Sequence, residues 1–286
     1  MLVNGVNLNV KVVGSGPAIV ALHGFTGDMS TWSEFVPEAE KKCTVITIDL
    51  LGHGNSDAPR APQRYRIEQT LDDIASVVHE LGFSQACWLG YSMGGRIALA
   101  AAAMIPNVCH CLVLEGASPG LRSTKARVLR QRKDEALADF ILKEGVAAFV
   151  DSWTEKPLFR SQKSLPTYVQ ERIRKQRLRN NPIGLANTLR VAGSGTQPSI
   201  HEMLPRISIP VLCIAGEYDH KFTTIARKIC NKLQNGRLEI MPGAGHATHL
   251  ERPRDFNRVV LDFLNESLNW SVASSDIGSR NRYRIV

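Results

Sequence analysis

The most informative segment of this sequence reads Gly90-Tyr91-Ser92-Met93-Gly94-Gly95-Arg96. Its G-x-S-x-G pattern alone is weak, because it arises by chance in about one chain of this length in ten. The surroundings strengthen it: residues 86–89 predict a short strand, and the Ala- and Leu-rich run 94–104 predicts a helix. A serine on a tight turn between a strand and a helix is typical of a nucleophile elbow. We therefore expect Ser92 to be a nucleophile, flanked by glycines because bulk there would collide with neighbouring backbone.

Such a serine needs a histidine base and an acid that orients the histidine. After a serine elbow, the acid precedes the histidine in the chain. The apolar run 211–215 predicts a late strand, and the loop after it carries Glu217 and Asp219. We expect Asp219 to be the acid, with Glu217 as the alternative, and the neighbouring His220 to lie on the surface.

The histidine base is expected in the loop after the final strand of the sheet. Residues 237–241 predict this strand, and the Gly-rich turn Pro242-Gly243-Ala244-Gly245-His246 follows it directly. We expect His246 to be the base because it ends this turn, whereas His249 begins the next helix.

An oxyanion hole requires two backbone N–H groups. One belongs to the residue after the nucleophile, which is Met93 here. The other comes from a loop after an early strand. The segment Leu22-His23-Gly24-Phe25-Thr26-Gly27 fits this loop, and we assign the N–H of Phe25. His23 and His53 are expected to support their loops by hydrogen bonds rather than to take part in chemistry.

Strand and helix patterns alternate along most of the chain. Strands are expected at 8–13, 18–22, 44–48, 86–89, 111–114, 211–215 and 237–241, and helices at 67–81, 94–104, 224–233 and 254–268. Such alternation implies a mostly parallel sheet covered on both faces. With the ordered serine, acid and histidine, it predicts an α/β-hydrolase fold.

The alternation stops between residues 120 and 205, where helical patterns and many charges replace strands. We interpret 120–205 as an inserted helical cap, and 1–119 with 206–268 as the α/β-hydrolase core. The polar, Ser-rich and basic stretch 269–286 is expected to be a disordered tail.

The chain of 286 residues has a formal net charge of +8. Between residues 121 and 190 there are 16 Lys and Arg against 7 Asp and Glu, so the cap carries the entire excess. Three explanations of this charge are possible: a nucleic-acid surface, a solvated helical surface or a pocket for an anionic substrate. The scarcity of aromatic residues and the lack of a nucleic-acid-binding motif disfavour the first.

The six cysteines show no C-x-x-C spacing, so neither a zinc site nor a redox dithiol is indicated. We expect buried, reduced thiols and hence a reducing compartment. Residues 1–17 lack the apolar stretch of a signal peptide, and the most apolar run, 97–105, is much shorter than the roughly 20 residues of a membrane span. These features predict a cytoplasmic protein with no membrane span.

Several segments together resemble the 2-succinyl-6-hydroxy-2,4-cyclohexadiene-1-carboxylate synthases of menaquinone biosynthesis, over about residues 1–266 and including the cap. Besides the segments 22–27 and 90–96, they are Leu114-Glu115-Gly116-Ala117-Ser118-Pro119-Gly120-Leu121, Arg130-Gln131-Arg132-Lys133-Asp134, Trp153 with Pro157-Leu158-Phe159, Arg177 ahead of Asn180-Asn181, Gly216-Glu217-Tyr218-Asp219-His220-Lys221-Phe222 and Gly245-His246-Ala247-Thr248-His249-Leu250-Glu251.

The resemblance implies a carbon–oxygen lyase that eliminates pyruvate from 2-succinyl-5-enolpyruvyl-6-hydroxy-3-cyclohexene-1-carboxylate, a small tricarboxylate. It implies the triad Ser92, Asp219 and His246, with the serine alkoxide acting as a base towards a ring proton. The family's substrate-binding residues correspond to Arg96, Arg130, Arg177, Tyr91 and Trp153. No cofactor, metal ion or nucleic-acid partner is expected, and the sequence carries no signal of an oligomeric state.

The position and chemistry of Arg96 also favour a substrate-binding role. It lies one helical turn after Ser92, and its planar guanidinium fits a carboxylate. A surface salt bridge on the helix is the alternative role for Arg96, as it is for the cap arginines. For the whole chain, the alternatives are a carboxylesterase or C–C bond hydrolase, a non-enzymatic receptor-like protein, and a cap and tail that bind anionic membranes or nucleic acid.

Overall fold

A computed structural model describes residues 1–268, so the tail expected at 269–286 lies outside the described residues. Within that range the main sheet has seven strands in the order β3-β5-β4-β6-β7-β8-β9, all parallel except the edge strand β3. This confirms the predicted mostly parallel sheet. The strands are β3 (Val10–Val13), β4 (Ala18–Leu22), β5 (Thr44–Ile48), β6 (Ala86–Tyr91), β7 (Cys109–Glu115), β8 (Val211–Gly216) and β9 (Gly236–Met241), and a separate hairpin joins β1 (Leu2–Val3) to β2 (Val6–Asn7).

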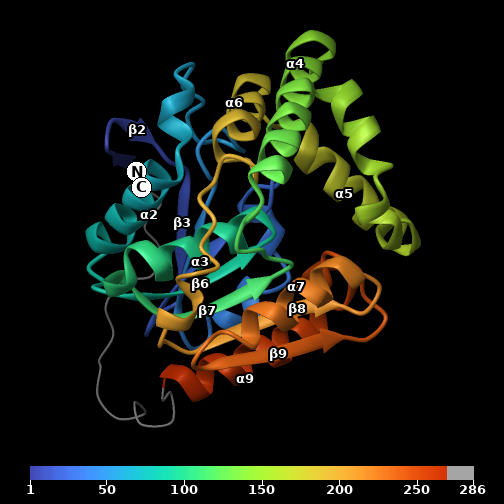
Figure 1. The fold of residues 1–286 in the computed structure, drawn as a ribbon. Coiled ribbons are helices and arrows are strands. Elements are labelled where there is room, and N and C mark those ends of the chain that lie inside the picture. Colours follow the sequence, from blue (N-terminus) through green and yellow to red (C-terminus); the bar gives the residue numbers. More distant parts are fainter. Residues whose placement is uncertain (269–286) are drawn as a thin grey trace.

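Helices cover both faces of the sheet (Figure 1). The central strands are buried on both sides, and their residues alternate between two apolar clusters. Val20, Trp88 and Leu112 pack in one cluster with α2 (Ile67–Glu80), α3 (Met93–Met104) and α7 (His220–Cys230). Ile19, Leu89 and Val113 pack in the other with α1 (Val36–Ala39) and α9 (Pro253–Leu268). Consecutive strand side chains point to opposite faces, so an all-apolar strand must be covered on both. Short helical segments complete the core: α8 (Thr248–Glu251), η1 (Met29–Trp32), η2 (Pro62–Tyr65), η3 (Pro106–Val108) and η5 (Leu204–Arg206).

The segment between β7 and β8 is helical and lies above the carboxyl ends of the strands (Figure 1). It holds α4 (Thr124–Thr154), η4 (Pro157–Ser164), α5 (Thr167–Leu178) and α6 (Pro182–Ala192). The helix α4 is interrupted at Gly145, whose φ of 84° leaves the helical region. Residues of α4 and α6 form a small apolar core of their own, which includes Phe149 and Leu185. We keep the name cap for residues 120–205; its exact boundaries stay a prediction.

One expectation about the cysteines is wrong. Cys87 and Cys111 form a disulfide with a Cα–Cα distance of 4.7 Å. They lie directly opposite each other on the parallel strands β6 and β7, on the same face of the sheet, which brings their sulfur atoms together. The remaining cysteines, Cys43, Cys109, Cys213 and Cys230, are free. The expectation of a reducing compartment rested on six reduced thiols and loses that support.

No helix within residues 1–268 is both long and apolar enough to cross a membrane.

Candidate active site

Ser92 occupies the strained turn between β6 and α3. Its φ of 53° and ψ of −100° are unusual for a residue with a side chain. The turn persists because the Ser92 N–H donates to the Glu115 carbonyl at 2.7 Å and close packing leaves no room for alternatives. A Cβ added to Gly90 would lie 2.3 Å from the Gly94 carbonyl carbon, and one added to Gly94 would lie 2.2 Å from the Leu22 carbonyl oxygen. The two glycines of the elbow are therefore required, as predicted.

The three residues expected to form a triad lie within hydrogen-bond distance of one another. The Ser92 hydroxyl lies 3.1 Å from Nε2 of His246, and Nδ1 of His246 lies 2.6 Å from Oδ2 of Asp219. With Nδ1 protonated, His246 donates to the carboxylate and accepts from the serine. His246 and Asp219 are 2% and 8% exposed, which keeps this chain of bonds out of bulk water. The arrangement can transfer a proton from the serine to the histidine.

Asp219, and not Glu217, is hydrogen-bonded to His246. Asp219 ends the loop after β8 and caps α7, because its Oδ1 accepts from the Phe222 N–H at 3.1 Å. One carboxylate oxygen thus anchors the helix while the other holds His246. The exposed Glu217 instead accepts from the Gly243 N–H at 2.8 Å. His220 is exposed, as expected for a surface residue.

The two N–H groups assigned to an oxyanion hole belong to residues that line the same cavity as Ser92. Met93 is the first residue of α3, so its N–H has no acceptor within the helix. Phe25 lies in the loop after β4, which adjoins β6 where the strand order reverses. Leu50 N–H donates to Nε2 of the buried His23 at 3.0 Å, so Nδ1 carries the proton and donates to the Gly24 carbonyl at 2.8 Å. His23 therefore ties the Phe25 loop to the loop after β5.

The second histidine expected to support a loop, His53, is also fully buried. Its Nδ1 lies 3.2 Å from the Leu51 carbonyl oxygen, and its ring lies beside His23 and Phe25. Burial, and to a smaller degree the neighbouring His23, lower the pKa of His53 to about 3. His53 is therefore neutral at pH 7, which suits a packing role.

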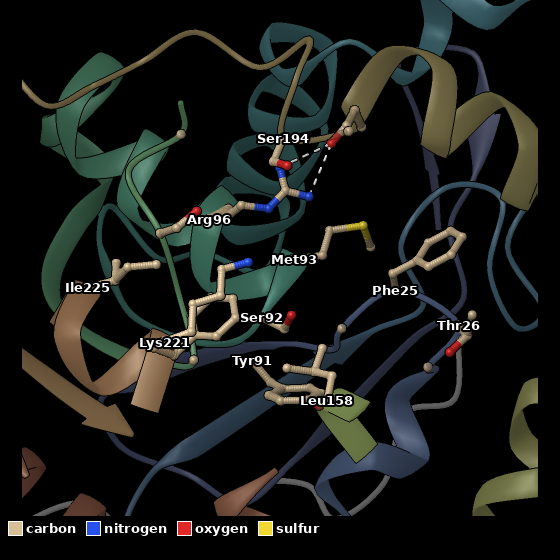
Figure 2. A pocket seen from close by; sticks show the side chains of 18 of the residues that line it. Phe25, Thr26, Tyr91, Ser92, Met93, Arg96, Leu158, Ser194, Lys221 and Ile225 are labelled. Atoms are coloured by element: carbon tan, nitrogen blue, oxygen red, sulfur yellow. Dashed lines mark hydrogen bonds between the residues drawn. The ribbon is translucent and has the colours of Figure 1, made fainter. Parts of the chain in front are cut away.

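Ser92 opens into a cavity of about 840 Å³ between the core and the cap. Figure 2 shows Arg96, Lys221, Met93 and Phe25 around the serine. Among the described residues that line this cavity, eight are basic and none is Asp or Glu: Arg96, Arg122, Arg130, Arg172, Arg177, Lys221, Lys228 and Lys232. Their positive field favours an anionic ligand over a neutral one.

Arg177 is the most deeply buried of these cations, with 5% of its surface exposed. Its guanidinium donates to Thr154 Oγ1 at 2.9 Å and to Gln162 Oε1 at 3.3 Å, and lies 4.6 Å from the centre of the Phe159 ring. Within residues 1–268 it makes no ion pair with a carboxylate. Burial lowers the pKa of Arg177, with Tyr91 opposing the shift. A buried cation without a counter-ion is costly, so a bound carboxylate would relieve that cost.

Arg96 and Arg130 also line the cavity. Arg96 donates to the Ala192 carbonyl at 3.2 Å and also to Gln197, both neutral acceptors (Figure 2). Burial, and then the charge of Arg130, lower the pKa of Arg96 to about 10, so it stays charged at pH 7. Arg130 differs, because Asp134 accepts from its Nε at 2.8 Å. Its side chain is 40% exposed, and the ion pair with Asp134 already neutralises part of its charge.

The two aromatic residues expected in the substrate site also line the cavity. The Tyr91 ring packs 5.3 Å from that of His246, measured between centroids. Burial raises the pKa of Tyr91 well above its ordinary value, so it stays a neutral hydroxyl. The Trp153 ring packs edge-on against Phe25 at 5.5 Å, and its buried indole N–H has no acceptor among the described residues.

Sequence reasoning missed two glutamates that hold the His246 loop. Glu115, fully buried at the end of β7, accepts from the Thr248 hydroxyl at 2.6 Å, from the His249 N–H at 3.0 Å and from His249 Nδ1 at 2.7 Å. Glu251 accepts from the Gly245 N–H at 2.6 Å. A charged residue that ends an apolar strand was the available signal for Glu115.

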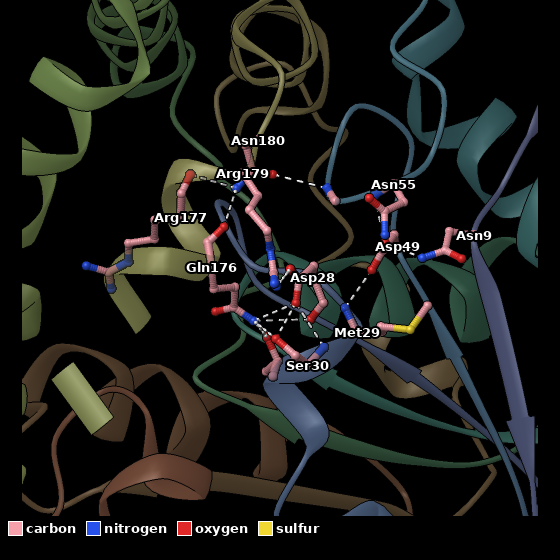
Figure 3. A network of polar contacts seen from close by, with 12 residues as sticks. Asn9, Asp28, Met29, Ser30, Asp49, Asn55, Gln176, Arg177, Arg179 and Asn180 are labelled. Carbon is pink, nitrogen blue, oxygen red and sulfur yellow. Dashed lines mark hydrogen bonds and ion pairs between the residues drawn. The ribbon is translucent and has the colours of Figure 1, made fainter. Parts of the chain in front are cut away.

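A polar network that joins the cap to the core was also missed (Figure 3). Asp28, 3% exposed, lies just beyond the Phe25 loop; it accepts from Gln176 at 2.9 Å and forms an ion pair with Arg179. Asn180 donates to the Thr26 carbonyl at 2.8 Å. Figure 3 shows the Arg177 side chain directed away from this network. The end of α5 thus fixes the loop that carries Phe25 while it presents Arg177 to the cavity.

Among residues 1–268, no group of three or more His, Cys, Asp or Glu is arranged to hold a metal ion.

A Ser-His-Asp arrangement at the carboxyl edge of a parallel sheet, beneath a helical cap, is typical of proteins with the α/β-hydrolase fold. A family model for the alpha/beta hydrolase fold matches residues 17–253, which agrees with this geometry. A Bacillus subtilis (strain 168) protein, provisionally named a 2-succinyl-6-hydroxy-2,4-cyclohexadiene-1-carboxylate synthase, is 44% identical over 86% of this chain and 90% of its own. A Salmonella paratyphi B protein with that synthase name is 34% identical over 83% of this chain and 89% of its own. The chain belongs to this family of α/β-hydrolase-fold enzymes.

The solved structure of MenH from S. aureus superposes on this chain with a TM-score of 0.87 at 33% identity. The match covers 91% of this chain and 98% of the other, so it includes both the sheet and the cap.

Proposed function

We propose that this protein is a carbon–oxygen lyase of menaquinone biosynthesis. It would eliminate pyruvate from 2-succinyl-5-enolpyruvyl-6-hydroxy-3-cyclohexene-1-carboxylate to give 2-succinyl-6-hydroxy-2,4-cyclohexadiene-1-carboxylate. The relatives that carry this synthase name support the proposal. The observation that carries it is the lining of the cavity, which within residues 1–268 combines Ser92 with eight Lys or Arg residues and no Asp or Glu.

This lining suits a substrate with three carboxylates. A simple ester would need an apolar pocket, whereas a trianion needs several cations close to the reacting atoms. Arg177 and Arg96 hold only neutral acceptors and keep donors available. We assign the substrate carboxylates to Arg96, Arg130 and Arg177, with Tyr91 and Trp153 against the ring. Each charge-assisted hydrogen bond to a carboxylate contributes about 1.5–3 kcal/mol.

In the proposed mechanism Ser92 acts as a base. His246, oriented by Asp219, takes the hydroxyl proton, and the alkoxide removes the ring proton alpha to the succinyl carbonyl. The oxygen of the resulting enolate accepts hydrogen bonds from the Phe25 and Met93 N–H groups. No acyl-enzyme forms.

The elimination then proceeds from the enolate. Its electron pair forms a new double bond to the neighbouring ring carbon, the existing ring double bond shifts by one position, and the bond between the ring and the enolpyruvyl oxygen breaks. The leaving group departs as the enolate of pyruvate and gains a proton. That proton comes from His246, while Ser92 keeps the proton taken from the ring, so the triad returns to its starting state.

The decisive experiment is a coupled assay of pyruvate release with wild type, Ser92→Ala and Arg96→Ala. We expect release by wild type, near-complete loss in Ser92→Ala, and a loss in Arg96→Ala with the fold retained, as judged by circular dichroism. Near-full activity in Ser92→Ala would refute the role of the serine. No release by wild type, together with turnover of p-nitrophenyl esters, would instead favour the alternative carboxylesterase.

A further inference from the structure

One face of α7 lines the active-site cavity with positive charge. Lys221, Ile225, Lys228, Ile229 and Lys232 all line it, and they are spaced by four, three, one and three residues. Positions separated by three, four or seven residues lie on the same side of a helix. We call Lys221, Lys228 and Lys232 the α7 lysine row. Its first two members lie within α7, and the third lies just beyond the end of the helix.

The charges of the α7 lysine row have no carboxylate partner in the described part of the chain. Within residues 1–268 none of the three ammonium groups makes an ion pair. Nζ of Lys221 lies 5.1 Å from the centre of the Phe222 ring. Arg172, which also lines the cavity, differs because it pairs with Glu34 at 2.9 Å.

The row runs outward from the nucleophile. Lys221 lies two residues after Asp219, and Figure 2 shows its amino group directed into the cavity near Ser92. Lys228 lies seven residues further, about 10 Å along the helix axis. At the far end, burial and then the charges of Arg122 and Lys232 lower the pKa of His201, which also lines the cavity.

Glu202, an acidic residue near the far end of the row, does not pair with these lysines. Glu202 pairs with Arg122 at 2.7 Å, and its side chain is 85% exposed. All three lysines of the row are exposed whereas Arg177 is buried, so a ligand in solvent can reach the row directly.

We propose that the α7 lysine row is an outer binding site for the carboxylates of the incoming substrate. This inference rests on the proposed function, and it adds a site that precedes the arginines around Ser92. Lysine is a compact charge on a flexible stem, so its contacts with a carboxylate exchange more readily than the paired bonds of arginine. A cleft lined by one sign of charge also raises the local concentration and association rate of an oppositely charged ligand by about 10–10³-fold.

The test compares two charge reversals on neighbouring residues of α7. Lys228→Glu alters the row, whereas Arg227→Glu makes the same charge change on an exposed residue that does not line the cavity. At about 20 mM ionic strength we expect kcat/KM for pyruvate release to fall by about ten-fold in Lys228→Glu, mainly through KM. We expect Arg227→Glu to stay within about two-fold of wild type. At about 0.5 M salt, where the Debye length is only a few Å, the difference between the variants should disappear.

Equal effects of the two substitutions, or a loss in Lys228→Glu that salt does not reduce, would overturn the outer site. If wild type releases no pyruvate, the proposed function fails, and the row is then judged by binding. Calorimetry with propane-1,2,3-tricarboxylate should give a several-fold weaker Kd for Lys228→Glu than for Arg227→Glu. No binding to wild type, or equal binding by both variants, would overturn the row independently. Thermal unfolding of both variants checks that the fold is kept.

Discussion

Replacing Arg177 by Met separates binding of the substrate from stability of the fold. Met replaces the aliphatic part of the arginine side chain and has no charge, so the variant removes the guanidinium together with its contact to the Phe159 ring. The variant loses two hydrogen bonds to neutral acceptors, on Thr154 and Gln162. The substitution also removes the free-energy cost of burying a guanidinium that makes no ion pair within residues 1–268 and is 5% exposed. Because these effects oppose each other, we expect the free energy of unfolding to change by no more than about 1–2 kcal/mol.

The effect of the Arg177→Met substitution on catalysis should be much larger. Loss of a paired guanidinium–carboxylate contact removes two charge-assisted hydrogen bonds, together worth about 3 kcal/mol or more. That corresponds to a drop of at least about 10²-fold in kcat/KM. Arg177→Lys keeps the charge but not the planar pair of donors, so its loss should be intermediate.

The matched control for Arg177 is Arg172, which lies on the same helix and also lines the cavity. Arg172 is 38% exposed on its side chain and pairs with Glu34, so we expect Arg172→Met to stay within about three-fold of wild type. Steady-state pyruvate release and urea unfolding on all variants make the comparison. If Arg177→Met kept kcat/KM within three-fold of wild type, or lost activity only in proportion to stability, the assignment of a carboxylate to Arg177 would be wrong.

Three further predictions concern the triad, a buried carboxylate and the disulfide. Asp219→Asn should lower kcat by about 10³–10⁴-fold with unchanged circular dichroism, because His246 loses the acceptor that orients it; a loss under ten-fold would contradict this. Burial tends to raise the pKa of Glu115, but its bonds to the His249 segment outweigh burial and lower it. A lowered carboxyl pKa contributes stability above the unfolded value of about 4.5 and loses it as pH falls through the folded value. Urea unfolding between pH 6 and 3 should therefore show a weaker pH dependence in Glu115→Gln than in wild type, and parallel curves would refute this. Alkylation of denatured protein should label four cysteines before reduction and six after it, because Cys87 and Cys111 are bonded; six labels without reduction would exclude the disulfide.

Much of the site follows from local patterns joined by one rule of sheet geometry. The elbow at Ser92 was predictable because its strand, turn and helix are contiguous in the sequence. Asp219 and His246 were predictable because both follow parallel strands, and the carboxyl ends of such strands meet at one edge of the sheet. Neither inference required a measured distance, since the chain order of the three residues already restricts the topology.

Other features depend on how distant segments meet. The Cys87–Cys111 bond needs the register of β6 against β7, which apolar strands do not specify from sequence alone. The contact of Glu115 with His249 joins residues 134 positions apart, and nothing near Glu115 in the chain identifies that partner. The geometry of both depends on how the strands and the loops after them pack.

The burial and pairing of the cap arginines could not be predicted from the sequence and follow from the tertiary structure. The sequence by itself determined the strand–elbow–helix unit at Ser92, the order of its acid and base, and the excess of positive charge in the cap. Many cap residues share that charge, and composition does not distinguish a solvated arginine from a buried one. Only the folded structure makes Arg179 the partner of Asp28 and, within residues 1–268, leaves Arg177 buried without a carboxylate two residues away on the same segment. The physical reason is that burial and pairing depend on the neighbours that packing supplies. The partner of Arg179 lies 151 positions away in the core, whereas the acceptors of Arg177 come from elsewhere in the cap.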